Sequence, residues 1–567
     1  MTRSRPDARP AVHAWTLATL LMAWPAAAQQ AGTGLPSREQ IAPNIPEGQA
    51  PPPRVTIEDR SAPPPCDLAP SQEQVDLRSA TFASAGGSAL PADIRILLAP
   101  IRPQPGLQPI AALCALRDRA AEALRQAGYI AAVTIPPQEI DAGEARFDVI
   151  LAHFEDVRLT GKPGRYAQRL ERRLAEIRAL RPVNQHVLER MLLAIDDIPG
   201  LSLTLTLRPA GTEAGAIIGD LAVDYDPFSL VATIDTLGSQ AIGPTIASSR
   251  AEFYGLTGLS DRSYLGVSTT LGSREQQLLQ LGHYLGNGRG LLAGGRLSYA
   301  WTRPSLPGFD IRSRSAVGAV DVTRQLLRAP DGELTLSAGI EIVDQKVKLH
   351  LPGQIVPLSR DRLRVAYARL SGSAQAGRHM LAGQIEVRQG LAILNAGSIA
   401  ATATGSRSND SSAAVVRATA EDVIAWGPAF SLAATLDGQW SSGRLPGFEQ
   451  YAIGNYTIGR GYDPGSASGD RALGLRLEPR LDVWPGDSLR PQVFGFVDHV
   501  RTWNAGTTTT AGDADGRFTS FGGGLRLVGP SAFAIETLYA HRSGKQAVAT
   551  GTSTASDRLL ASIALRF

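Results

Sequence analysis

The last nine residues of the chain carry an apolar side chain at every second position and end on an aromatic ring. The apolar positions are Leu559, Ala561, Ile563, Leu565 and Phe567. A period of two places them on one face of a β-strand. A lipid-facing strand of an outer-membrane β-barrel has this pattern, with its polar residues on the other face. An edge strand of a soluble sandwich can have it too, so the rest of the chain must distinguish the two.

The composition excludes several other classes of protein. The chain has 567 residues, enough for two to four domains, and no run of 18 apolar residues follows the amino terminus. A helical membrane protein is therefore not expected. Glycine is abundant (58), whereas Cys (2), Met (4) and His (8) are scarce, which favours a turn-rich exported β-protein over a metalloenzyme. A net charge of +3 is too small to indicate a nucleic-acid-binding protein.

The amino terminus has the pattern of a secretory signal over residues 1–28. Arg3, Arg5 and Arg9 precede a short apolar core, and three alanines at 26–28 form a cleavage site. The alternative is an apolar amino terminus of a cytoplasmic protein. Export would place Cys66 and Cys114 in an oxidising compartment. The two cysteines then either form a disulfide or stay unpaired and buried.

The mature chain divides by pattern into a linker, two small modules and a long β-rich segment. Residues 29–75 contain eight prolines between positions 43 and 65, and we expect an extended spacer with neither helix nor sheet ladder. Helical stripes and alternating strands then follow one another twice, which predicts two α+β modules at 76–154 and 155–226. The expected helices cover 110–124 (ending at Gly128), 166–177 and 188–195, and the expected strands cover 129–135, 146–153, 201–207 and 221–225.

Residues 227–567 contain no helical stripe and consist of short alternating segments between turn residues. Examples are 229–235, 296–301, 333–342, 432–440 and 533–539. Transmembrane strands need ~9–11 residues each, so with turns and loops this length predicts about 16 strands, although 14 or 18 would also fit. The number must be even and the sheet closed, because an open edge in lipid leaves backbone groups unpaired.

The most specific motif is Arg460-Gly461-Tyr462, and a strand pattern with Phe496 and Asp498 on one face lies further along the chain. The motif and the order of segments resemble the two-partner secretion transporters, the haemolysin and filamentous-haemagglutinin secretion family. These carry periplasmic polypeptide-transport-associated (POTRA) modules before a barrel. Shorter stretches also resemble this family, namely 128–130, 136–138, 199–200 and 234–243. Gly459 and Val500 depart from the family pattern, which has Val or Ile and Gly at these positions.

The resemblance implies that Arg460 lies at the tip of a long loop folded into the barrel, where its guanidinium pairs with Asp498 beside Phe496. It also implies a disulfide between Cys66 and Cys114. Many members have an amino-terminal helix that plugs the pore, but residues 29–42 give too little helical pattern to predict one.

The function implied is transport of one unfolded exoprotein across the outer membrane, with the POTRA modules binding the cargo by strand addition. Other partners would be outer-membrane lipid and, during biogenesis, the barrel assembly machinery that recognises Phe567. The rivals are a barrel assembly factor, a diffusion porin and a barrel-borne enzyme. We expect no catalytic residues, cofactor, metal, nucleotide or nucleic acid, since the sequence contains no phosphate-binding loop, no G-x-S-x-G elbow and no His or Cys cluster.

Overall fold

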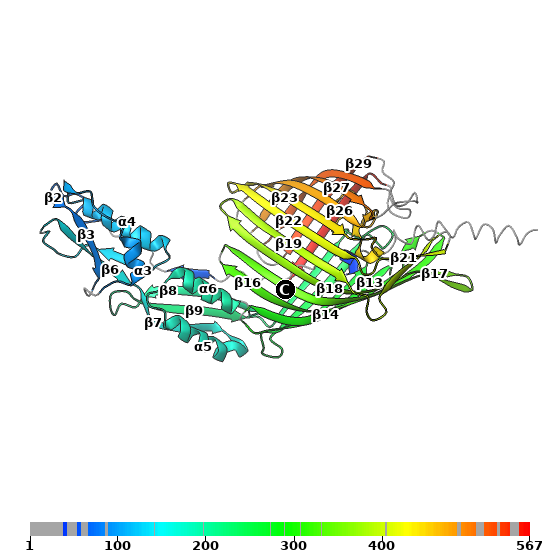
Figure 1. Cartoon of the computed structure of the whole chain (residues 1–567), viewed down its shortest axis with the longest axis horizontal. Coiled ribbons are helices and arrows are strands. Elements are labelled where there is room, and N and C mark those ends of the chain that lie inside the picture. Colours follow the sequence, from blue (N-terminus) through cyan, green and yellow to red (C-terminus); the bar gives the residue numbers. More distant parts are fainter. Residues whose placement is uncertain are drawn as a thin grey trace, which may run out of the picture. The chain divides into compact units, whose positions relative to one another are not determined.

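The computed structural model forms two compact units, one of residues 49–226 and one that contains 227–567 together with the amino-terminal segment (Figure 1). The predicted signal segment lies outside the described residues. The structure describes residues 38–41, 54–57 and 66–567, apart from gaps at 86–88, 141, 197, 273, 289, 307, 330, 403–404, 485–488, 506–514, 530–532 and 545–554.

The first module packs two helices on a short sheet. Four apolar residues of the longer helix are at most 1% exposed, as the predicted stripe requires: Leu113, Leu116, Ala120 and Leu124. The helix ends before Gly128, whose φ of +82° few residues other than glycine adopt. The elements are β2 (Gln74–Leu77) paired with β4 (Gly106–Pro109), the sheet β3-β6-β5 (Ser79–Ser84, Glu144–Leu151, Ala131–Thr134), α3 (Ala92–Leu98) and α4 (Ala112–Gln126).

Two contacts hold the ends of α4. Cys66 and Cys114 form a disulfide, which ties the segment before β2 to the first turn of the helix. Beyond the carboxyl end, the hydroxyl of Tyr129 donates a hydrogen bond to Asp93 on α3. This bond raises the pKa of Tyr129 to about 12.

The second module has its own core, separate from that of the first. The predicted alternation of the strand beginning at Leu201 is confirmed, since Leu201, Leu203, Leu205 and Leu207 are all at most 3% exposed. They pack with Leu170 and Leu174 from the helix stripe. The elements are β7 (His153–Lys162), α5 (Ala167–Arg178), α6 (Gln185–Asp196), β8 (Leu201–Pro209) and β9 (Ala216–Tyr225), with sheet order β1-β8-β9-β7.

The linker departs from the expectation that it would contain no sheet ladder. Residues Arg54–Ile57 form β1, which pairs in parallel with β8 in the register Arg54 to Thr204 and Ile57 to Leu207. These four residues lie between the proline clusters at 51–53 and 63–65 and contain no proline. Every one of them therefore retains the backbone N–H that a ladder needs.

Sixteen of the strands between residues 228 and 566 form a closed antiparallel barrel, which confirms the predicted fold class. Three further strands, β15 (Ser305–Leu306), β20 (Gly397–Thr402) and β21 (Gly405–Asn409), extend its rim. The barrel strands are β10 (Phe228–Asp235), β11 (Ile246–Tyr254), β12 (Arg262–Thr270), β13 (Gln276–Gly286), β14 (Leu291–Thr302), β16 (Phe309–Ala329), β17 (Gly332–Leu351), β18 (Gln354–Ala376), β19 (His379–Gly390), β22 (Ala414–Trp426), β23 (Phe430–Ser441), β26 (Arg471–Asp482), β27 (Arg490–Trp503), β28 (Gly516–Val528), β29 (Phe533–Ser543) and β30 (Asp557–Arg566).

The carboxyl-terminal strand closes the barrel. β30 pairs with β10 from Val231–Arg566 to Asp235–Ser562, and the backbone of Phe567 exchanges two hydrogen bonds with Leu230. Its outward side chains are apolar and exposed, with Leu559 79% and Phe567 71% accessible. The strand with alternating apolar residues at the carboxyl terminus therefore forms the seam of the barrel. No helix among the described residues is long and apolar enough to cross a membrane.

Removing the disulfide should loosen the first module alone. The bond closes a loop of 48 residues, which is worth ~4 kcal/mol in the chain-entropy estimate. In the intact protein carrying Cys66→Ser and Cys114→Ser, hydrogen exchange in α4 should accelerate by up to about a thousandfold, while exchange in the barrel strands stays unchanged. Equal exchange of α4 with and without the bond would contradict this.

Candidate functional site

The barrel interior holds a long loop, residues 442–470, which joins β23 to β26 and is called here the lumenal loop. It contains a short 3-10 turn, Gly447–Glu449, and a two-residue ladder between β24 (Tyr451–Ala452) and β25 (Ser468–Gly469). Its residues Ile453, Ile458 and Tyr462 are at most 2% exposed and pack against Val500 and Phe518 on the wall. The loop is therefore seated on the inner wall, as the resemblance implied for the Arg460 motif.

Asp498 holds the backbone of the motif. Its carboxylate, 0% exposed on β27, accepts hydrogen bonds from the backbone N–H groups of Gly459 and Arg460 at 3.0 and 2.9 Å. The same carboxylate binds the guanidinium of Arg476 at 2.8 and 3.1 Å. Arg476 also donates to the carbonyl of Thr457, so Asp498 and Arg476 together grip the loop on both sides of the turn.

The guanidinium of Arg460 does not bind Asp498, which corrects the side-chain pairing that the resemblance implied. It donates instead to Glu478 on β26 at 2.6 Å and lies 4.7 Å from the ring centre of Phe496. Arg476 already occupies Asp498 side-on, which explains the different partner. Both Phe496 and Asp498 therefore contact the motif. Phe496 does so through its ring, and the carboxylate of Asp498 does so by accepting hydrogen bonds from backbone N–H groups of the motif.

Gly461 and Tyr462, the other two residues of the motif, lie in close contact with the barrel wall. A Cβ on Gly461 would come within 2.6 Å of the Cβ of Ser520, so only glycine lets the loop lie this near to β28. The hydroxyl of Tyr462 bridges to the backbone of Thr519, and its ring packs edge-on against Phe518 at 5.3 Å. Arg558 of the closing strand donates to the carbonyl of Tyr462 and pairs with Asp463 at 3.3 Å.

Both departures from the family pattern have a physical reason. Gly459 has a φ of +120°, a conformation that a branched Val or Ile could not adopt without strain. Val500 is 0% exposed and fills the apolar cluster under the lumenal loop.

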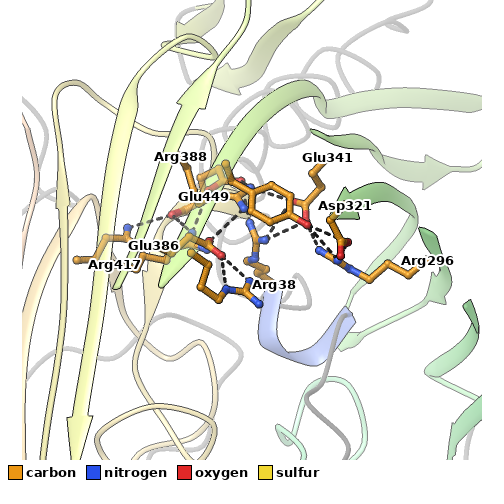
Figure 2. A network of polar contacts seen from close by, with 11 residues as sticks. Arg38, Arg296, Asp321, Glu341, Glu386, Arg388, Arg417 and Glu449 are labelled. Atoms are coloured by element: carbon orange, nitrogen blue, oxygen red, sulfur yellow. Dashed lines mark hydrogen bonds and ion pairs between the residues drawn. The ribbon is translucent and has the colours of Figure 1, made fainter. Parts of the chain in front are cut away.

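A second set of contacts anchors the start of the lumenal loop, and it was not predicted from the sequence (Figure 2). Glu449 of the loop accepts hydrogen bonds from Arg388 on β19 at 2.8 and 3.2 Å and from Arg417 on β22 at 2.9 Å. Arg388 is 1% exposed and also binds Glu341 on β17 at 2.7 Å. We call this set the arginine–glutamate network. It comprises Arg38, Arg296, Asp321, Glu341, Glu386, Arg388, Arg417 and Glu449.

The amino-terminal segment joins the same network. Arg38, on the four-residue helix α2 (Arg38–Ile41), lies 3.0 Å from both Glu341 and Glu449. The residue is placed inside the barrel, although no plug helix could be predicted from residues 29–42. One side chain thus links the amino-terminal segment, the wall and the lumenal loop.

The alternation along the strands does indicate which charged residues face the barrel interior, although these residues were not predicted as part of a site. Arg476, Glu478 and Arg480 alternate with Leu473, Leu475 and Leu477 on the other side of β26, so the charged face must point into the barrel. Glu341, Glu386 and Arg388 follow the same rule on β17 and β19. Which of these charges meet depends on strand register, and the sequence alone does not give it.

A protein-family model described as "Haemolysin secretion/activation protein ShlB/FhaC/HecB" matches residues 222–527, more than half of the chain. The chain belongs to this family. It is an outer-membrane transporter of the two-partner secretion type. No protein with a curated description matches its sequence.

Solved structures with the same fold include two with the name CdiB. The one from Escherichia coli superposes with a TM-score of 0.63 at 16% identity, covering 90% of this chain and 94% of its own. CdiB from Acinetobacter baumannii gives 0.56 at 15% identity, covering 88% and 91%. BamA from Haemophilus ducreyi lacking POTRA domains 1–3 gives 0.50 at 13%, covering 87% and 100%. These similarities show that this chain has the same fold as the CdiB and BamA structures.

Neutralising Glu449 should free the start of the lumenal loop. Glu449→Gln weakens the contacts to Arg388, Arg417 and Arg38 and leaves those guanidinium groups with fewer counter-charges in a buried site. We expect larger and more frequent openings of the pore, measured as ion conductance in planar bilayers. The matched control is Glu421→Gln, an interior-facing glutamate on β22 whose nearest basic group is Arg480 at 3.8 Å. Equal conductance of both variants and the unchanged protein would contradict the anchoring role.

Proposed function

We propose that this transporter moves a haemolysin- or haemagglutinin-type exoprotein, in an unfolded state, through the barrel after residues 76–154 and 155–226 have bound it as POTRA modules. The observation that carries the proposal is the lumenal loop. It occupies the inside of the barrel through ion pairs and hydrogen bonds, and hydrogen bonds to water or to the cargo can replace these polar contacts when the loop moves.

Cargo binding by strand addition needs an open sheet edge. Among the described strands, the first module ends its sheet on β3 and β5, and the second module ends on β7. The other end of that sheet is β1, a strand of only four residues that covers the edge of β8. In β7 a bulge lies between Phe154 and Asp156, and Arg178 binds the carbonyl of Val157. β3 and β5 are therefore the edges best suited to an extended cargo segment.

Passage through the barrel requires the lumenal loop to leave its seat or to shift within it. Arg460 contributes the contacts to Glu478 and Phe496, whereas Asp498 holds backbone groups that every residue at these positions would offer. A substitution of Arg460 therefore changes how the side chains hold the loop, while the backbone hydrogen bonds that seat the loop remain. The sequence has no nucleotide-binding motif to supply energy, and we propose that folding of the exoprotein outside the cell drives its movement.

Replacement of Arg460 by alanine should lower secretion of the cognate exoprotein by at least tenfold while the barrel still inserts. The measurement is the ratio of secreted to cell-associated exoprotein, with barrel insertion checked by the heat-dependent mobility shift of the folded barrel. Arg501→Ala is the matched control, because Arg501 is exposed on the outside of β27, where it pairs with Asp515 at 3.6 Å and lies 5.6 Å from the ring centre of Trp503. Normal secretion by the Arg460 variant would remove the loop from the mechanism.

A further inference from the structure

β16, β17 and β18 are among the longest strands of the barrel (Figure 1). Five cations gather on their outer face. We call them the basic patch. It comprises Arg312, Arg314, Lys346, Lys348 and Arg360, all exposed. They alternate with buried residues such as Ser313, Ser315, Gln345 and Val347, which face the interior. The patch therefore lies on the outside of the barrel and not in the transport path.

The register places like charges directly opposite one another. Arg314 faces Lys346, and Lys346 faces Arg360, so one row across three strands carries three positive charges. The next row pairs Arg312 with Lys348. Opposed like charges destabilise a sheet. Such an arrangement is retained most easily where an anion from outside lies among the cations.

The protein itself supplies little compensation. Asp310 pairs with Arg312 at 2.8 Å, and Asp344 is engaged by Arg364 at 3.3 Å. Within the described part of the chain, Arg314, Lys346, Lys348 and Arg360 have no carboxylate within ion-pair distance. Arg314, Lys346 and Lys348 also line a shallow groove with Tyr299, Asp344 and His350.

An apolar groove lies further along β16 and β17 on the same outer face. Its floor is formed by Gly295 and Gly318, and its sides by outward-facing Leu297, Val320, Ile340 and Ile342. Gly318 and Ile342 are opposed to each other, two residues along the strands from the pair Ala316 and Asp344, and four from Arg314 and Lys346. The spacing from apolar groove to cationic row is thus roughly 13 Å along the strand.

The patch lies at the extracellular end of the barrel. The longest connections, 391–413 and 442–470, lie at this end, whereas connections such as 377–378 and 427–429 lie at the other end. Outer-membrane barrels have their longer loops outside the cell. Trp301, opposite Arg314, is 43% exposed and marks the aromatic level of the membrane interface.

We propose that the outer face of β14, β16, β17 and β18 binds a phosphorylated glycolipid of the outer leaflet. Acyl chains would lie in the groove over Gly295 and Gly318, and the phosphate groups would lie among Arg314, Lys346, Lys348 and Arg360. A soluble acidic protein would match the charges but not the apolar groove that continues from them into the membrane. Only an amphiphile with several phosphates fits both parts.

The test is lipid retention by the full-length protein, measured by native mass spectrometry after incubation with diphosphorylated lipid A. Arg314→Gln with Lys346→Gln should weaken retention by about 30-fold, the effect of removing two cations beside an anionic lipid. The matched control is Arg501→Gln with Arg517→Gln, also opposed cations at the extracellular end, but with Asp515 beside Arg501. The control should retain the lipid normally.

Two further measurements separate the parts of the site. Lipid A without phosphates and phosphatidylglycerol, which has one phosphate, should both bind at least tenfold more weakly than the diphosphorylated lipid. Gly318→Leu should reduce retention with all cations in place, because a Cβ at Gly318 has no neighbour closer than 3.9 Å and the new side chain fills the groove. Equal retention by the Arg314 and Lys346 variant, equal loss in the control variant, or equal binding of the three lipids would overturn the proposal.

Discussion

The structure depends on one constraint, which is that no backbone amide or carbonyl can stay unpaired in the hydrocarbon of a bilayer. β30 satisfies it by pairing with β10, so that the last residues of the chain complete the ring of hydrogen bonds begun at residue 228. Closure also divides every strand into an outward and an inward face. The apolar side chains of β30 are therefore exposed to lipid, while Arg558 on the same strand points inward to the lumenal loop.

Closure creates a second requirement inside the barrel. The inner wall carries ionised side chains that are almost fully buried, including Glu341, Arg388, Glu478 and Asp498. Buried charges are costly unless each has a partner of opposite charge or several hydrogen bonds. The lumenal loop supplies part of that compensation through Glu449, Arg460 and the amides at 459 and 460. Its resting position follows from the charges on the wall.

The kind of contact that holds the lumenal loop decides how easily cargo can displace it. A loop held by apolar packing alone would leave a large unfavourable surface when displaced. The lumenal loop packs Ile453 and Ile458 in an apolar cluster against the wall. Its contacts through Glu449, Arg460 and the amides at 459 and 460 are polar, so water or an unfolded polypeptide can replace those contacts group by group. The same argument applies to Arg38, which shares Glu341 and Glu449 with wall and loop. Movement of the amino-terminal segment and of the loop would then be coupled through shared carboxylates.

The sequence predicted elements where a strong period covers many residues, as in α4, β8 and β30. It did not predict β1, β3, β4 or β7, because strands of four to ten residues without clean alternation resemble loops, and β1 lies inside a proline-rich linker. The site was predicted in part. Arg460, Phe496 and Asp498 do meet, since the motif fixes the loop tip, but the partner of the guanidinium depends on the register that places Glu478 and Arg476 beside it.

Cross-linking the lumenal loop to the wall tests whether transport requires the loop to leave its position. A Cβ at Gly474 on β26 would lie 3.0 Å from the Cβ of Ile458 in the loop, so Ile458→Cys with Gly474→Cys needs only a small shift to form a disulfide. We expect the bond to form in intact outer membranes and to stop exoprotein secretion, and we expect reduction to restore secretion. The Ile458→Cys variant alone should secrete normally. Secretion that continues with the bond fully formed would show that the loop need not move, and thiols that never join would show that the loop does not lie against β26.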